Sequence, residues 1–157
     1  MGKINMQKVL VGGLIAGVFL NIVDYVQFGV VLKDQMAAAM QALGKPAMTN
    51  AQIPWFVVLD LVLGVFLVWL YAAIRPRFGA GPATAAKAGV GAWFVAGLLG
   101  MLFMWPMGLM PHSFMITTTL VSLVEWPLAT VIGAKFYTEG AGMGAGMGAG
   151  AGMGARM

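Results

Sequence analysis

The sequence has no cysteine, one histidine and few charged residues. Without cysteine it can form neither a disulfide scaffold nor a thiolate-ligated metal site. Charged residues make up 9% of the 157 residues, whereas a soluble domain usually carries about 25% because it needs a wetted surface. Hydrophobic residues make up 61%. These proportions exclude a water-soluble monomer and indicate a membrane protein.

Four apolar runs are each long enough to cross a bilayer, whose hydrocarbon core needs about 20 helical residues. They cover roughly residues 9–32, 54–74, 85–105 and 114–136. The first run is longer than the apolar region of a signal peptide, about 7–15 residues, and no cleavage pattern follows it. The sequence therefore predicts an all-α membrane protein. It consists of a four-helix transmembrane bundle over residues 1–139 and a low-complexity Gly/Ala/Met tail over residues 140–157.

The basic residues are distributed unevenly between the two sides of these four spans. Cytoplasmic loops carry an excess of lysine and arginine, so the more basic side is predicted to be cytoplasmic. This places both termini in the cytoplasm. The net charge of +4 then reflects topology, and we expect no nucleic-acid partner. The more basic side has Lys3, Lys8, Arg75, Arg77, Lys87, Lys135 and Arg156, and the other side has Lys33 and Lys45.

The connections between the spans contain helix-boundary signals. Asp34–Leu43 is predicted to form a short helix in the outer membrane interface, with Asp34 capping its start. Thr49 and Gln52 have the spacing of a capping box, and Pro54 follows at a position typical of a first helical turn. The second span is therefore expected to begin there.

Two strips of small residues occur at a spacing of four. In lipid, helices associate mainly through close backbone approach and hydrogen bonds, because hydrophobic driving force is weak there. We therefore expect both strips to be helix-packing surfaces, within the chain or between copies. The strips are Gly13 and Gly17 in the first span, and Ala88, Ala92, Ala96 and Gly100 in the third.

Three acids, Asp24, Asp60 and Glu125, fall inside the apolar runs without a basic residue beside them. A charged carboxylate at the centre of a span costs about 2.5–3.5 kcal/mol on insertion scales. Either the carboxyls are protonated and hydrogen-bond between helices, or they bind a cation, a proton or a ligand headgroup in a wet cavity. Asn21 and Gln27 share a helix face with Asp24. The sequence predicts a polar patch in the outer half of the bundle.

The histidine and a methionine series are weaker candidates. His112 lies in the outer turn and would join Asp24 and Asp60 as a metal ligand or pH sensor only if that turn folds inward. Thioethers suit Cu(I), but methionine also fills gaps between helices, and Pro106 interrupts the series. We expect no cofactor and no resident metal. The methionines are Met101, Met104, Met107 and Met110.

Four segments are distinctive in combination: Lys3-Ile4-Asn5, Val11-Gly12-Gly13-Leu14, Asn21-Ile22-Val23-Asp24-Tyr25, and the turn from Trp69 to Pro82. Through them the sequence resembles a family of small, uncharacterised bacterial integral membrane proteins with four spans. The resemblance covers roughly residues 3–137. It implies the four-span topology and a bacterial inner membrane, and it implies nothing about mechanism.

The sequence contains no catalytic motif of the common hydrolase, metalloprotease or nucleotide-binding types, so we expect no enzyme. The first hypothesis is a non-enzymatic accessory or scaffolding subunit. It would pack through the small-residue strips, as a homo-oligomer or with other membrane subunits. The second is a small proton- or cation-linked transporter or channel using the three intramembrane carboxyls, as an oligomer because four helices enclose little space. Copper handling by methionine is the third.

Overall fold

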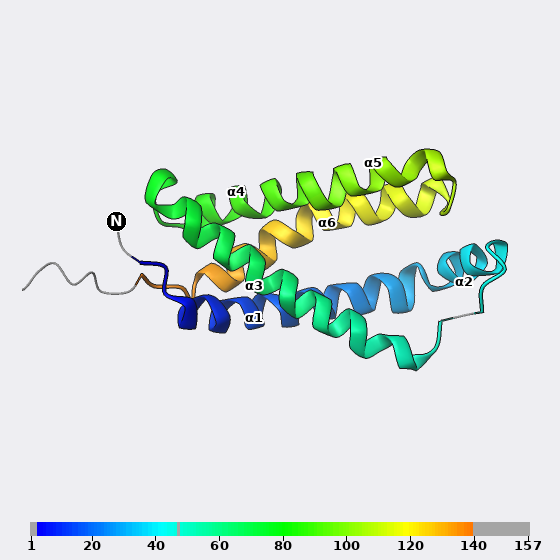
Figure 1. Ribbon diagram of the computed structural model, residues 1–157, viewed down its shortest axis with the longest axis horizontal. Coiled ribbons are helices and arrows are strands. Elements are labelled where there is room, and N and C mark those ends of the chain that lie inside the picture. The colour runs from blue at the N-terminus through cyan, green and yellow to red at the C-terminus, as the bar shows by residue number, and fades with distance from the viewer. Residues whose placement is uncertain (1–2, 47, 140–157) are drawn as a thin grey trace, which may run out of the picture.

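The computed structural model describes residues 3–46 and 48–139, whose regular elements are helices (Figure 1). The Gly/Ala/Met tail predicted over residues 140–157 lies outside the described residues. The α-helices are α1 (Met6–Val26), α2 (Lys33–Ala42), α3 (Ile53–Phe78), α4 (Pro82–Ala92), α5 (Gly100–Met104) and α6 (His112–Ala134).

Two of the long helices contain a π-helical segment, in which each backbone N–H bonds five residues back. Helix α1 continues as a π-helix over Gln27–Val31. Helices α4 and α5 are joined by a π-helix over Trp93–Leu99, and α5 ends in a 3₁₀ turn over Trp105–Met107.

The described residues therefore contain four helices long and apolar enough to cross a membrane, which confirms the predicted all-α, four-span architecture. The spans observed in the structure differ from the predicted ones by up to four residues at each end. They are Met6–Val31, Asn50–Phe78, Pro82–Met107 and His112–Ala134.

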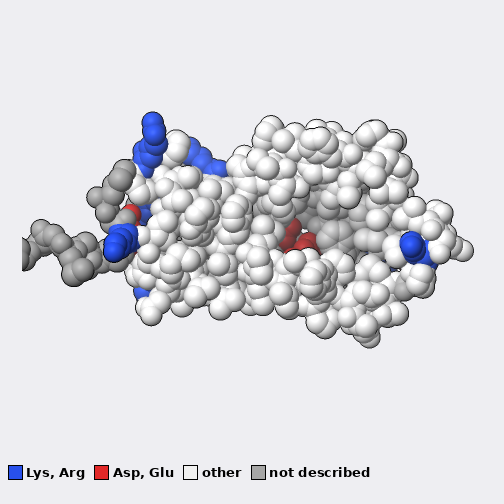
Figure 2. Space-filling view, viewed as in Figure 1, with Lys and Arg blue, Asp and Glu red and all other residues white. Residues whose placement is uncertain are grey.

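The spans form two helix pairs, α1 with α3 and α4 with α6. Helix α6 also packs on α1, and α3 crosses to reach α4. Figure 1 shows the two pairs separating towards the end that holds α2, which we call the α2 end. On the face shown in Figure 2, lysine and arginine side chains lie only at the two ends of the molecule. The end opposite the α2 end, which holds Arg75 and Lys87, is called the basic end below.

Glycines bring the helix backbones into direct contact. A Cβ atom added to Gly17 of α1 would lie 2.6 Å from the Cα of Leu61 on α3. Gly12 of α1 and Gly133 of α6 face each other, since a Cβ on Gly133 would lie 2.6 Å from the Gly12 carbonyl oxygen. Gly13 packs on the backbone of α3 in the same way as Gly17. Gly13 and Gly17 therefore both lie in the contact between α1 and α3.

The small-residue strip predicted in the third span continues only as far as Ala92. Ala88 and Ala92 are buried, but Ala96 is exposed, and a Cβ on Gly100 would meet nothing within 4 Å. The buried position moves to Gly97. The π-helix over Trp93–Leu99 is the physical reason, because its wider turn rotates every following residue away from the face expected for an α-helix.

Two helix starts are predicted in the connection after α1: the prediction for α2 is wrong, and the one for the second span is confirmed. Helix α2 begins at Lys33, and Leu32 occupies its N-cap without a side-chain hydrogen bond. Asp34 therefore lies in the first turn and is not the cap. The capping box is confirmed, because the Thr49 backbone N–H donates to Gln52 Oε1 at 2.8 Å at the start of the second span.

Candidate functional site

The close crossing of α1 and α3 brings two of the three predicted acids together. Gly17 packs on the backbone of Asp60, whose carbonyl oxygen would lie 2.9 Å from a Cβ at Gly17. Two helical turns further along α1, Asp24 carries a carboxyl group that lies close enough to that of Asp60 for the two to interact.

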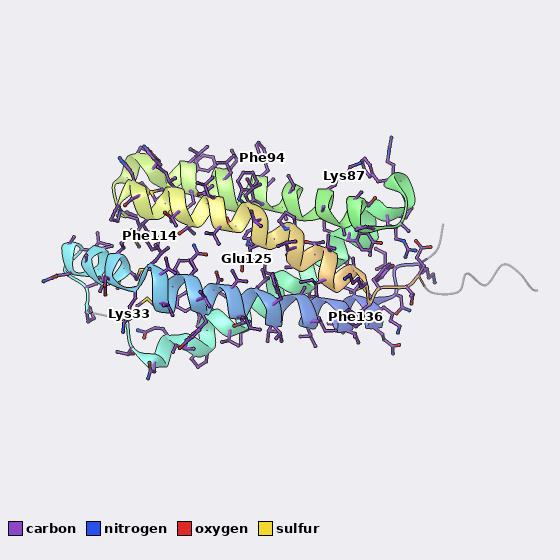
Figure 3. The ribbon with its side chains drawn as sticks, turned by 180° about the vertical axis from the view of Figure 1, so that it is seen from behind. Lys33, Lys87, Phe94, Phe114, Glu125 and Phe136 are labelled. Atoms are coloured by element: carbon purple, nitrogen blue, oxygen red, sulfur yellow. The ribbon has the colours of Figure 1, made fainter. Side chains whose placement is uncertain are left out.

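Glu125 of α6 is the third acid of this group. Its side chain is only 4% exposed, and it lies near enough to Asp24 and Asp60 for the three charges to interact. Its Oε1 atom has no hydrogen-bond partner among the described residues. Figure 3 shows Glu125 in the space between α6 and α1. Asp24, Asp60 and Glu125 are called the carboxylate cluster below.

The carboxylate cluster is accessible from one side of the bundle. Figure 2 shows acidic atoms at the bottom of a hollow in the middle of the molecule, surrounded by uncharged residues. The hollow lies where the two helix pairs separate, between the crossing of α1 with α3 and the α2 end.

Asn21 and Gln27, predicted on the same face of the first span as Asp24, have different environments. The Asn21 Nδ2 atom donates to the carbonyl oxygens of Gly17 at 2.9 Å and Val57 at 3.3 Å, so it ties α1 to α3. Gln27 is the first residue of the π-helical segment and is 5% exposed. Its Nε2 atom has no hydrogen-bond partner among the described residues.

Hydroxyl groups on α6 add to the polar surface between the helices. The Thr119 hydroxyl donates to the Met115 carbonyl oxygen at 2.7 Å, and the Ser122 hydroxyl to the Thr119 carbonyl oxygen at 3.1 Å. The Thr118 hydroxyl oxygen is buried without a partner in the described part of the chain. The sequence indicates these hydroxyls through a run of three threonines, residues 117–119, followed by Ser122 in the outer half of an apolar span.

His112 does not join the carboxylate cluster. It is exposed at the start of α6, and its ring stacks on that of Trp105 with 4.2 Å between the centroids. In the part of the chain that the structure describes, no three His, Asp or Glu side chains are arranged to hold one metal ion. The hypothesis of a metal site formed by His112, Asp24 and Asp60 is therefore wrong.

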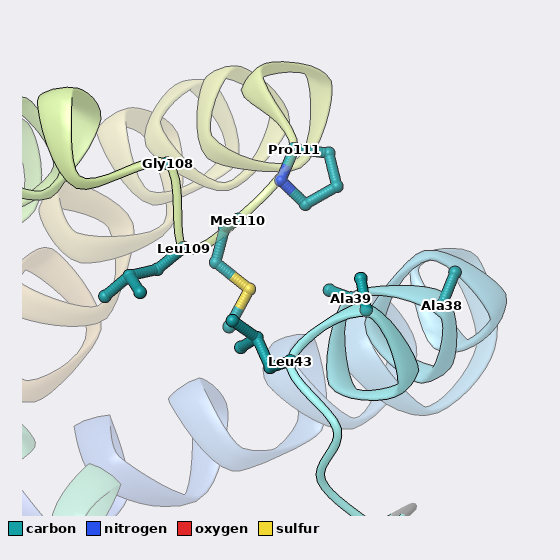
Figure 4. A pocket seen from close by; sticks show the side chains of 8 residues that line it. Ala38, Ala39, Leu43, Gly108, Leu109, Met110 and Pro111 are labelled. Carbon is teal, nitrogen blue, oxygen red and sulfur yellow. The ribbon is translucent and has the colours of Figure 1, made fainter.

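The methionine series is divided by the 3₁₀ turn at the end of α5. Met104 and Met107 are 49% and 62% exposed, and Met101 is half-buried. Met110 lines an apolar pocket of about 380 Å³ between α2 and the turn before α6 (Figure 4). That pocket contains no ionisable side chain, and its lining includes none of the carboxylate cluster.

No protein-family model, curated protein or solved structure matches the chain. The chemistry of the site therefore follows from its geometry alone. Three acidic groups, one of them almost fully buried, share a hollow among apolar helices, and such a group can accept protons or bind a cation.

Proposed function

We propose that this multi-pass membrane protein is a small proton- or cation-linked transporter, and that the carboxylate cluster binds the transported or coupling ion. The observation that supports this role is Glu125, which is 4% exposed, has an orphan carboxyl oxygen and faces two further acids. Burying ionisable groups inside a span is costly, and those found there commonly mark ion pathways.

The basic residues do not neutralise the negative charge of the carboxylate cluster. Among the described residues the ion pair is between Arg75 Nε and Glu139 Oε1, 3.7 Å apart at the basic end. Within the spans the acids therefore have only each other, neutral polar groups and whatever enters the hollow. A cation that binds in the hollow would supply the positive charge that the neighbouring side chains do not provide.

The small-residue strips, on which the scaffolding hypothesis depends, are mostly used for packing within the chain. Gly13 and Gly17 are covered by α3 of the same chain, and Ala88 and Ala92 are buried. These four residues are therefore not free to bind another subunit, and of the two strips only Ala96 and Gly100 stay uncovered. The copper hypothesis is favoured by no observation, since Met104 and Met107 are exposed near a helix break.

The proposed orientation follows from charge. The basic end faces the cytoplasm together with both termini, which places α2 in the outer interface and the carboxylate cluster in the outer half of the bilayer. The resemblance to bacterial four-span proteins supports an inner-membrane location. Because four helices enclose little space, we expect the protein to work as a homo-oligomer or with other membrane subunits.

Ion flux through liposomes containing the full-length chain tests the proposal. Proton uptake and alkali-cation flux are measured under an imposed gradient for the wild type, Asp60→Asn and Glu125→Gln. We expect either substitution to reduce flux at least tenfold while circular dichroism and gel filtration stay unchanged. The matched control is Asp34→Asn, which neutralises an exposed acid outside the spans. Flux at the wild-type rate in both cluster variants would overturn the proposal.

A further inference from the structure

We propose that the basic end binds the phosphate group of an anionic phospholipid, and that Arg75 donates the hydrogen bonds to its oxygens. This site lies outside the carboxylate cluster and is independent of the transport role. The guanidinium group of Arg75 is fixed by its neighbours, has a buried donor without an acceptor, and lies near exposed apolar side chains at the end of a span.

Two tyrosines hold the Arg75 side chain in place. Its guanidinium carbon lies 5.6 Å from the centroid of the Tyr137 ring, and Tyr137 is 5% exposed. The Tyr137 ring meets that of Tyr71 edge to face, with 5.9 Å between the centroids. Tyr71 in turn accepts a hydrogen bond from the backbone N–H of Gly81. Because aromatic faces attract guanidinium groups, these contacts fix the guanidinium group where α3 meets the residues that follow α6.

Arg75 has a buried donor that no acceptor in the described part of the chain satisfies. Its Nη1 atom is buried and has no hydrogen-bond partner there. Its Nε atom lies 3.7 Å from Glu139 Oε1, whereas N–H···O hydrogen bonds measure about 2.7–3.2 Å. Buried polar groups are almost always paired, so the unpaired Nη1 indicates an acceptor that the described residues do not supply.

A guanidinium group selects an oxyanion. It carries a positive charge, only donates hydrogen bonds, and has a planar fork that matches two oxygens of a phosphate or carboxylate group. The Glu139 carboxylate already offers one such oxygen, but at a distance too long for a hydrogen bond, and its side chain is 39% exposed. An exposed ion pair of this kind is worth little, so a better-placed oxyanion can displace Glu139 from Arg75.

The basic end as a whole attracts anions. Helix α1 begins there, and α3 and α6 end there (Figure 1). The basic residues that the described part of the chain contributes to this end are Lys3, Lys8, Arg75, Arg77, Lys87 and Lys135. Glu139 is the one acid among the described residues at this end. Clusters of lysine and arginine at span ends bind anionic headgroups, so a ligand with net negative charge is favoured over a zwitterionic one.

Apolar side chains next to Arg75 indicate that the phosphate belongs to a lipid. Arg75 lies about one helical turn before Phe78, the last residue of α3, so it is at the depth where a span meets the headgroups. Phe78 is 56% exposed, and Phe136, next to Tyr137 in the sequence, is 45% exposed. The Lys87 Nζ atom lies 5.4 Å from the centroid of the Phe78 ring, so a second cation is close to the same surface. Acyl chains can cover such apolar surface while the headgroup phosphate reaches Arg75, whereas a free phosphate ion gains nothing from it.

Lipid binding to the full-length chain in detergent, measured by native mass spectrometry, tests the proposal. The probes are dioleoylphosphatidylglycerol, the zwitterionic dioleoylphosphatidylcholine, and glycerophosphoglycerol, which is the anionic headgroup without acyl chains. For the wild type we expect the anionic lipid to bind about tenfold more tightly than either of the other two probes.

Substitutions around Arg75 should change the affinity for the anionic lipid in opposite directions. Arg75→Gln should lower it by about tenfold to hundredfold, because it removes hydrogen bonds to a charged group. Arg77→Gln, the control that removes the same charge at an exposed neighbour, should lower it by about fivefold at most. Glu139→Gln should raise it by about twofold to fivefold, because the competing carboxylate is gone.

Four results would overturn the proposal. Equal losses in Arg75→Gln and Arg77→Gln would mean that general surface charge attracts the lipid. Equal affinity for the two lipids would exclude a ligand selected by its net negative charge, and glycerophosphoglycerol binding as tightly as the lipid would make the source a free phosphate. An unchanged or lowered affinity in Glu139→Gln would show that its carboxylate does not compete for Arg75. Because a gain in affinity cannot result from misfolding, Glu139→Gln keeps the test decisive if Arg75→Gln fails to fold.

Discussion

Gly64 of α3 lies directly on the backbone of Gly17 of α1, so that a Cβ at Gly64 would lie 2.7 Å from the Gly17 Cα. This contact allows the two helices to approach at backbone distance. On the α2 side of the same crossing, the carboxyl groups of Asp24 and Asp60 lie close together. The position of the carboxylate cluster is therefore set by glycine packing as much as by the acids themselves.

Gly64→Ala is expected to destabilise the protein by about 1–3 kcal/mol, the usual cost of overpacking. The atoms that a new methyl group would meet are backbone atoms of Gly13 and Gly17, which cannot rotate away. The free energy of unfolding in detergent, measured by denaturant titration, checks this.

Gly91→Ala is the matched control, since a Cβ there meets nothing within 4 Å and the residue lies in α4. Alanine is favoured over glycine in a helix by about 0.5–1 kcal/mol, so this variant should be as stable as the wild type or more so. Equal losses in Gly64→Ala and Gly91→Ala would show that the α1–α3 contact is not tightly packed.

Asp24→Ala is expected to cost about 1–3 kcal/mol of stability, because it leaves the Asp60 carboxyl without its partner. Asp24→Asn should cost less, since an amide can still donate to Asp60. Combining Asp24→Ala with Asp60→Ala should cost less than the two single losses together, by about 0.5–3 kcal/mol. Additive losses in a double-mutant cycle measured by thermal unfolding would argue against direct contact.

The sequence predicts the large features of this fold because they depend on single-residue chemistry. Apolar runs of bilayer length indicate the four spans, and the Thr49–Gln52 capping box is a local pattern. The π-helices are not predicted, because no residue type in Trp93–Leu99 requires one and tertiary packing selects it. Because of this π-helical segment, Gly97 is buried and Ala96 is exposed, the reverse of what a regular α-helix predicts.

The sequence predicts which acids form the candidate site, but it does not predict the helix contacts around them. Asp24, Asp60 and Glu125 stand out as acids within apolar spans, and their sequence depth indicates a common region. The contact of Gly12 with Gly133 joins two helices that are far apart in the sequence, and such a contact is not encoded locally. The same limit explains why the sequence does not predict Gly64, Gly89 and Gly133 as packing residues, although a Cβ at each would meet backbone atoms of a neighbouring helix.

Tyr71→Phe is expected to reduce stability by about 0.5–1.5 kcal/mol, the usual net value of one hydrogen bond. The Tyr71 hydroxyl accepts a hydrogen bond from the Gly81 backbone N–H at 3.2 Å, and the side chain is 4% exposed. This bond fastens the turn between α3 and α4 at the basic end. Tyr25→Phe is the control, because Tyr25 is 71% exposed. Thermal unfolding that shifts equally for both variants would count against the Tyr71 contact.

Gly97→Ala tests the π-helix in the third span. A Cβ at Gly97 would lie 2.8 Å from Trp93 Cδ1, so the indole must move, and its Nε1 now donates to the Thr119 carbonyl oxygen at 3.0 Å. We expect a loss of about 1–3 kcal/mol in unfolding free energy from overpacking and the lost hydrogen bond.

Gly100→Ala, where a Cβ meets nothing, should be neutral or stabilising by about 0.5–1 kcal/mol. A regular α-helix through this span would reverse the order, because the strip of Ala88, Ala92, Ala96 and Gly100 would then face the neighbouring helix. The ranking of Gly97→Ala and Gly100→Ala in the same denaturant titration therefore distinguishes a π-helical third span from a continuous α-helix.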